Sequence, residues 1–185
     1  MADPIAVWHA EHMRFARLLD FLEQQMTVFH DGEDPDYELM RDVLHYLHYY
    51  GDQYHHPRED VAFACLVKRD PELKPAINRL LQEHRVIAAI GEALLHHLED
   101  ILEDTVVERE SVEAAAATYL VYYRHHLSTE EREVLPRAAR FLDPDDWAAV
   151  ASAVASAPDP LFGDDVGERY RELRRRLRSA AENVN

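Results

Sequence analysis

The sequence predicts an all-α protein, an up-down-up-down four-helix bundle with a short C-terminal helical extension. Only five of the 185 residues are glycine, so little interrupts a helix. Long runs repeat apolar residues at steps of three and four, which is the helical period. Short polar turns join these runs, which makes successive helices antiparallel neighbours. We expect the bundle to span residues 1–142 and the extension residues 143–185.

The first helix is expected over Pro4–Phe29. Asp3 is placed to cap it, and proline fits the first helical position because its missing N–H is not needed there. His12 falls in the same helical series as the apolar residues, so we expect it to face the interior. The apolar members of this series are Ile5, Trp8, Phe15, Leu19, Leu22, Met26 and Phe29.

Three more long helices follow. After the turn HDGEDPD, the second is expected over about Asp36–Lys68, with a bend near Pro57. The third covers about Pro71–Leu102 and the fourth about Glu108–Leu142. The inward-facing series of both helices include polar residues. The series of the third helix is Ile77, Leu80, His84, Ile87, Gly91, Leu94, Leu98 and Ile101. The series of the fourth is Val112, Ala116, Tyr119, Tyr123, His126 and Glu130.

The C-terminal extension contains two shorter helices. The segment DPDDW caps the first, which we expect to run to about Ser156, and APDPLFGDD links it to the basic helix ERYRELRRRLRS. Tyr170, Leu173 and Leu177 form a stripe on the basic helix. We therefore expect this helix to dock on the acidic bundle rather than bind nucleic acid.

Composition narrows the classes of function. Twenty Lys and Arg against 36 Asp and Glu give a net charge of −16, which disfavours nucleic acid and suits cations. The single cysteine, Cys65, excludes an internal disulfide and a thiolate metal cluster. Neither a signal-peptide pattern nor a membrane-spanning apolar stretch is found, so we expect a cytoplasmic protein without a membrane partner. Homo-oligomerisation stays open.

Six inward polar residues fall at one level of the predicted bundle. Counting ~1.5 Å per residue from the helix ends places all of them ~15–20 Å from the same end. Chance placement would scatter them along the bundle. The six residues are His12, His55, Glu59, His84, His126 and Glu130.

The spacing of these residues points to metal binding. His55 and Glu59 are four residues apart, as are His126 and Glu130, so each pair shares one helix face. Buried carboxylates need compensation, and a divalent cation provides it. Four imidazoles and two carboxylates are more ligands than one tetrahedral ion can bind, but they fit two metals that are bridged by carboxylates. This ligand set suits iron, manganese or zinc.

A rival pair stands one position further along the second helix. His56 and Asp60 repeat the four-residue spacing of His55 and Glu59. Residues one apart point about 100° apart, so the two pairs cannot face the same interior point. The apolar series favours His55 and Glu59, and we expect His56 and Asp60 to turn away.

The fourth helix has similar neighbours. Glu131 is a rival to Glu130 in the ligand set. His125 is adjacent to His126 and is expected to point away, in a supporting or exposed position. Among the tyrosines of the second and fourth helices, we favour packing, with Tyr50 or Tyr123 as the candidates for hydrogen bonding to a ligand of the metals.

The motifs resemble those of the hemerythrin-like, or HHE cation-binding, domains. The order is His, HxxxE, His, HxxxE, and the resemblance covers about residues 1–142. The matching segments are EHMRFARLLDFL, HHPREDVAF, LQEHRVI and HHLSTEEREVLP.

This resemblance implies a non-haem di-iron site with two Fe ions joined by carboxylate or oxo bridges; manganese or zinc stays possible from the donor set. It makes His12, His55, His84 and His126 terminal ligands and Glu59 and Glu130 bridging carboxylates. Oxygen-carrying hemerythrins have a second histidine one turn after the first on the third helix, where this chain has Ala88. One metal would then lack a protein ligand or borrow another group.

The resemblance leaves three roles open. The chain is expected to bind O2, NO or related small ligands at this centre. The alternatives are an oxidoreductase that reduces peroxide, O2 or NO, and an iron-binding or storage protein. An open coordination position would admit such small molecules.

Overall fold

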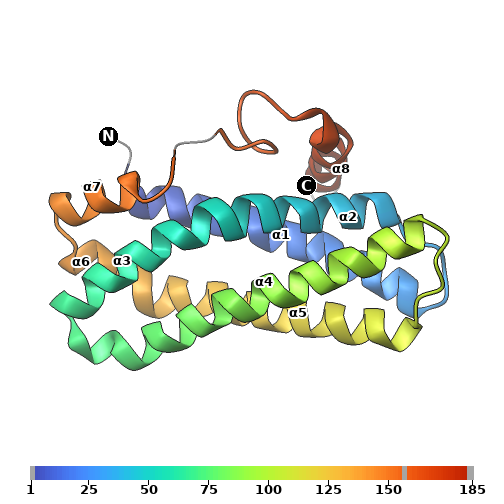
Figure 1. The fold of residues 1–185 in the computed structure, drawn as a ribbon. Helices are drawn as coiled ribbons and strands as arrows, with labels where there is room; N and C mark the ends of the chain where they lie inside the picture. The colour runs from blue at the N-terminus through green and yellow to red at the C-terminus, as the bar shows by residue number, and fades with distance from the viewer. Residues whose placement is uncertain (1–2, 156–157, 183–185) are drawn as a thin grey trace.

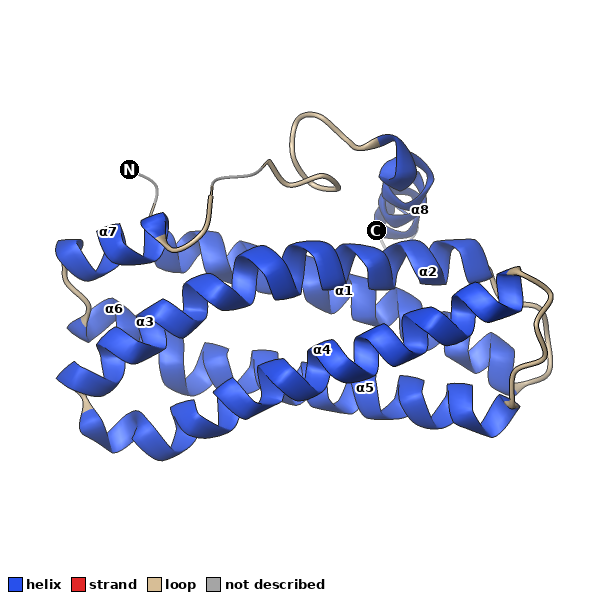
Figure 2. Cartoon of the chain, in the orientation of Figure 1, coloured by secondary structure: helices blue, strands red, loops and turns tan. Residues whose placement is uncertain are grey.

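The computed structural model describes residues 3–155 and 158–182, and every regular element in these ranges is a helix (Figure 2). This confirms the predicted all-helical class. The α-helices are α1 (Pro4–His30), α2 (Tyr37–Tyr46), α3 (His56–Arg69), α4 (Lys74–Leu102), α5 (Arg109–Thr129), α6 (Leu135–Phe141), α7 (Pro144–Ser152) and α8 (Arg171–Glu182). Two π-helices, η1 (Leu47–His55) and η3 (Glu130–Val134), and two 3-10 turns, η2 (Pro71–Leu73) and η4 (Glu168–Tyr170), connect them.

Four long helical segments lie side by side and run in alternating directions (Figure 1). They are α1, the continuous run α2–η1–α3, α4, and the run α5–η3–α6. Short connections at the two ends of the molecule join them. Because the polar residues of interest lie at matching depths in these segments, this arrangement brings them to one level.

Helix starts follow the capping residues in the sequence. The Asp3 carboxylate accepts a hydrogen bond from the backbone N–H of Ile5, and Pro4 occupies the first helical position. Asp143 forms a reciprocal capping box with Asp146 at the start of α7. These side chains satisfy backbone N–H groups that have no partner within the helix.

Both HxxxE motifs lie at the edge of a π-helix. The second long segment leaves α geometry over Leu47–His55, just before Pro57. The fourth does so over Glu130–Val134, just before Pro136. Proline cannot donate the backbone hydrogen bond that the α-helix requires, so the helix is locally widened before it. A π-helix is a frequent feature of functional sites in helices.

The hydrophobic core is divided into two clusters. One contains Phe15, Leu44, Leu94 and other residues of the α1, α2, α4 and α5 interior. The other surrounds Trp8 and Phe63 nearer the opposite end. In the first three long segments the candidate site residues lie between the members of these two clusters, and in the fourth Glu130 lies between Leu127 and Val134. The polar layer is therefore enclosed by apolar packing along the bundle axis.

The extension packs on the outside of the bundle. The Trp147 ring of α7 lies against Trp8, with centroids 5.4 Å apart. Helix α8 crosses α2 (Figure 1), and Leu173 is fully buried there. Arg176 pairs with Asp36 at 3.5 Å. The basic helix thus lies on the acidic bundle, as its apolar stripe predicts.

Two further observations concern the sequence predictions. Helix α7 ends at Ser152, and the predicted end near Ser156 lies outside the described residues. Within the described ranges, no helix is both long and apolar enough to cross a membrane.

Candidate metal centre

The six predicted inward residues are all buried in the polar layer. Helix α1 supplies one of them, η1 and α3 supply two, α4 supplies one, and α5 and η3 supply two. The most exposed of the six, His84, has only 7% of its surface accessible. The residues are His12, His55, Glu59, His84, His126 and Glu130.

Glu59 lies between two sets of imidazoles. Its Oε1 atom is 3.0 Å from Nε2 of His55 and 3.3 Å from Nε2 of His12. Its other oxygen, Oε2, is 3.6 Å from Nε2 of His84. The two oxygens of this carboxylate therefore face imidazoles from different helices.

Glu130 is arranged in the same way. Its Oε1 atom lies 3.2 Å from Nε2 of His126 and 3.8 Å from Nε2 of His84. Its Oε2 atom lies 3.5 Å from Nε2 of His12. Each carboxylate thus presents one oxygen toward α1 and the other toward α4, and Glu130 also reaches α5.

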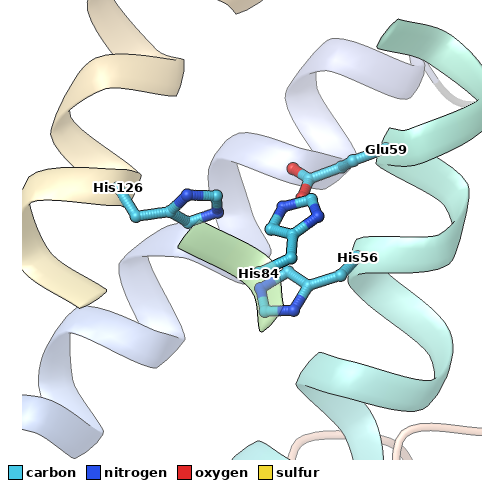
Figure 3. Close-up of side chains that lie close together, drawn as sticks. All are labelled: His56, Glu59, His84 and His126. Carbon is cyan, nitrogen blue, oxygen red and sulfur yellow. The ribbon is translucent and has the colours of Figure 1, made fainter. Parts of the chain in front are cut away.

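The prediction that His56 turns away from the interior is wrong. Its side chain is buried, its ring stacks on that of His84 with centroids 4.2 Å apart, and the His126 ring lies 5.4 Å away (Figure 3). His55 instead lies against His12, with ring centroids 5.0 Å apart. Adjacent helical residues do point about 100° apart. The interior extends past both sides of α3, so His55 faces α1 while His56 faces α4 and α5.

Two overlapping groups of side chains bring potential ligand atoms together. In one, the atoms of His56, Glu59, His84 and His126 lie within 4.8 Å of one another, and these side chains converge from three helices (Figure 3). In the other, the atoms of His12, His55 and Glu59 meet the same limit. Glu59 belongs to both groups. Imidazole and carboxylate donors in such groups fit a bound metal cation.

Carboxylates behind the imidazoles hold their outer nitrogens. The Nδ1 atom of His55 is 2.7 Å from Glu11, and that of His12 is 2.7 Å from Glu131. A carboxylate that accepts the Nδ1 proton leaves the Nε2 lone pair free to bind a metal. For these two residues, Nε2 is the atom that faces the layer.

The other three buried imidazoles follow the same pattern. Nδ1 of His84 is 2.8 Å from Asp60. Nδ1 of His56 is 3.1 Å from Asp52. Nδ1 of His126 is 3.4 Å from Glu83. All five imidazoles of the layer therefore have a carboxylate near Nδ1 and turn Nε2 inward, although Nδ1 of His126 makes no hydrogen bond with Glu83.

Glu11 is the most firmly held of these outer carboxylates. It accepts hydrogen bonds from the hydroxyl of Tyr50 and from the Arg58 guanidinium, in addition to its contact with His55. Burial raises the pKa of Glu11, but His55 and Arg58 more than offset this and lower it to about 2. Glu11 is thus ionised and fixes the orientation of His55.

Sequence reasoning missed Glu11, Asp52 and Glu83. Glu11 and Glu83 each directly precede an inward histidine, in EHMRF and QEHRV, and Asp52 precedes His56 by four residues. Glu11 supports His55 on another helix, and Glu83 likewise supports His126. Only the three-dimensional arrangement reveals these pairs, whereas the four-residue spacing of Asp52 and His56 was a usable signal.

Three residues near the site lie at its edge. The side chains of Asp60, Glu131 and His125 are 48%, 31% and 51% exposed. Asp60 and Glu131 reach the layer only through the outer nitrogens of His84 and His12. His125 points toward Glu83 instead of the interior, as expected.

The carboxylates in and around the layer favour the protonated, positively charged form of two of its histidines. Burial lowers the pKa of His12, but hydrogen bonds with Glu131 and Glu59 prevail and raise it to about 10. His84 follows the same pattern, because contacts with Asp60, Glu130 and Glu59 outweigh burial and raise its pKa to about 11. In the metal-free protein, these two imidazoles carry protons at neutral pH.

Several buried atoms of the layer have no hydrogen-bond partner among the described residues. A buried polar atom without a partner is rare in folded proteins and costs free energy. A cation bound among these atoms would satisfy them together. The inward-facing ones are Nε2 of His56, His84 and His126, Oε2 of Glu59, and both carboxylate oxygens of Glu130.

The fold and the site together define a helical protein whose buried histidines and glutamates fit a metal ion. The family model described as Hemerythrin HHE cation binding domain matches residues 3–138. The chain therefore belongs to the hemerythrin HHE cation-binding family, which confirms the resemblance predicted from its motifs. Searches of curated proteins and of solved structures each gave no match.

Proposed function

We propose that this protein holds a non-haem di-iron centre inside an up-down-up-down four-helix bundle and binds O2, NO or related small ligands there. The observation that carries the proposal is the placement of Glu59 and Glu130. Each directs its two oxygens toward different imidazoles, as a carboxylate does when it bridges two metals. Terminal ligands would be His12, His55, His84 and His126.

Iron is one of the metals that this set of imidazole and carboxylate ligands suits. Imidazole with carboxylate binds iron, manganese or zinc, and two carboxylates offset much of the charge of two divalent ions. When bound, iron would supply redox electrons and open coordination positions for a small ligand. The outer carboxylates orient the rings with Nε2 toward the layer, where a metal would replace the protons that His12 and His84 carry in the metal-free protein. The two apolar core clusters restrict water around the layer.

An oxidoreductase that reduces peroxide, O2 or NO is the alternative, and one observation favours it. The Tyr123 hydroxyl is buried without a partner among the described residues, and its ring lies 5.9 Å from that of His56. Burial raises the pKa of this hydroxyl well above its ordinary value, so it keeps its proton. A protonated phenol beside the site is a potential proton donor for reduction.

Metal analysis of the iron-reconstituted protein tests the proposal. We expect about two irons per chain, an absorption spectrum that changes on exposure to O2, and loss of at least one iron in His84→Ala. His125→Ala is the matched control, because His125 is half-exposed and points away from the layer. Iron-free protein without a spectrum after reconstitution would overturn the proposal. A stable, reversible spectrum favours a binding role, and rapid turnover of peroxide or NO favours the enzyme.

A further inference from the structure

His56 has the environment of a metal ligand rather than that of an ordinary buried histidine. A core histidine normally hydrogen-bonds through both ring nitrogens, because an unpartnered buried nitrogen is costly. His56 is 3% exposed, and its Nε2 atom has no partner among the described residues. Because Asp52 lies at Nδ1, Nε2 is the nitrogen left for the group that His56 forms with Glu59, His84 and His126.

We propose that His56 binds one of the two metals through Nε2, as a third imidazole beside His84 and His126. This rests on the proposed dinuclear centre and adds a ligand to it. Four atoms, one each from His56, Glu59, His84 and His126, lie within 4.8 Å of one another. Ligands about 2.1 Å from one ion lie at most about 4.2 Å apart, so small side-chain movements would complete the site.

The outer contact of His56 supports this assignment. Asp52 lies 3.1 Å from its Nδ1 atom, and the other oxygen of Asp52 is 3.2 Å from Nδ1 of His48. Asp52 is thus held in position from the solvent side. The other four imidazoles of the layer have the same arrangement, with a carboxylate at Nδ1 and Nε2 turned inward. His56 shares with the four ligands its burial in the layer and a carboxylate beside Nδ1, and these two features are best explained if it is a fifth ligand.

His56 also accounts for the alanine on α4. The sequence has Ala88 one turn after His84, where oxygen-carrying hemerythrins have a second histidine. Stacking of the His56 ring on that of His84, at 4.2 Å and 12° between planes, brings an additional imidazole to the same neighbourhood from α3. The third imidazole of this metal would therefore come from the neighbouring helix.

The two metal positions of the resulting centre would differ in their number of imidazole ligands. One metal would have the imidazoles of His56, His84 and His126, and the other those of His12 and His55. A third imidazole strengthens binding, so the first equivalent of metal should occupy the three-imidazole position.

Proton NMR of the full chain loaded with Co(II) tests the proposal directly. Each imidazole bound through Nε2 keeps an exchangeable Nδ1 proton, and a nearby Co(II) shifts its signal far outside the usual range. We expect five such signals from wild-type protein, which disappear in D2O, and four from His56→Phe. The phenylalanine keeps an aromatic ring against His84 but has no nitrogen. If wild-type protein binds two Co(II) ions but gives only four signals, His56 is not a ligand, while the dinuclear centre still stands. Protein that binds no Co(II) would overturn the dinuclear centre as well.

Metal affinity provides the second measurement. We expect His56→Phe and His56→Ala to bind one of the two Co(II) ions at least about tenfold more weakly than wild type. Added imidazole should restore the visible spectrum of His56→Ala, because it can fill the vacated position. Combining His56→Ala with Ala88→His should also restore it, by supplying the nitrogen from α4. If neither imidazole nor Ala88→His changes the variant, and circular dichroism shows that it is folded, a ligand role for His56 is refuted.

Discussion

Replacing Glu11 by glutamine tests whether the carboxylates behind the imidazoles organise the site. Glu11 is 4% exposed and contacts His55, Tyr50 and Arg58. The variant keeps the shape of the side chain but removes its charge. His55 and Arg58 then lose a charged partner. Both oxygens of Glu11 accept hydrogen bonds, so the single acceptor oxygen of glutamine cannot replace them, and the ring of His55 is held less firmly with Nε2 inward.

The magnitude follows from the pKa of Glu11. Burial raises this pKa, whereas His55 and Arg58 lower it, and the net change from 4.5 to about 2 corresponds to ~3 kcal/mol of folding free energy at neutral pH. Because the folded pKa lies below the unfolded one, this stability is present above pH 4.5 and lost as the pH falls through about 2. For a chain of this length, ~3 kcal/mol lowers the Tm by roughly 6–12 °C.

Thermal unfolding and Co(II) titration measure the two effects of Glu11→Gln. We expect the lower Tm in the metal-free protein and Co(II) binding that is roughly 10–100-fold weaker, as for other residues that orient a ligand. Glu23→Gln is the matched control on α1, because Glu23 is 54% exposed and pairs with Arg124 at the surface. Its Tm should stay within about 2 °C of wild type, since surface pairs contribute ~0–1 kcal/mol. If Glu11→Gln behaves like Glu23→Gln in both assays, the reasoning is refuted.

Four further predictions concern protons, the carboxylates and packing. Since His12 and His84 have pKa values of about 10 and about 11 in the metal-free protein, they carry protons at pH 7 that metal binding must displace; weakly buffered titration should record about two protons released per chain, and none released would contradict this. The same raised values predict that metal-free protein loses stability as the pH rises through about 10, which urea unfolding between pH 7 and pH 10.5 would reveal. Glu130→Ala should leave fewer than two metals per chain by elemental analysis, and full loading would exclude a bridging role. Gly91→Ala should lower the stability by ~1–3 kcal/mol in urea unfolding, because the added Cβ would lie 2.8 Å from the Tyr119 ring; wild-type stability would show that the ring moves aside freely.

The helical fold and the polar layer follow from sequence patterns that operate over short distances. The series through His12 and His84 placed both residues on inward faces, and counting the helical rise brought them level with the two HxxxE motifs. These inferences need only the period of a helix and the alternation of helix direction. The six residues lie in the layer although η1 and η3 depart from α geometry.

The inward position of His56 does not follow from helical spacing, for a specific reason. Helical phase separates it from His55 by about 100°, and one interior point was assumed. The layer has two groups of ligand atoms, one on each side of Glu59, so both histidines can face inward. Sequence spacing gives the direction of a side chain from its own helix, but the width of the interior depends on how the four segments pack.

The outer carboxylates illustrate the same limit. Glu11 on α1 contacts His55 on the second segment, and Glu83 on α4 contacts His126 on α5. No spacing within a single helix predicts a pair that forms between helices. Asp52 and His56 share one segment, and their four-residue spacing could have predicted their contact.

The most direct test of the dinuclear centre is the iron content and magnetic behaviour of protein reconstituted with Fe(II) without oxygen and then oxidised. Carboxylates that bridge two irons couple their spins. We therefore expect about two irons per chain and a Mössbauer spectrum of a coupled, diamagnetic diferric pair. Glu59→Ala and Glu130→Ala should weaken that coupling or leave fewer than two irons per chain. One iron per chain, or two irons with independent spins, would contradict a centre bridged by Glu59 and Glu130.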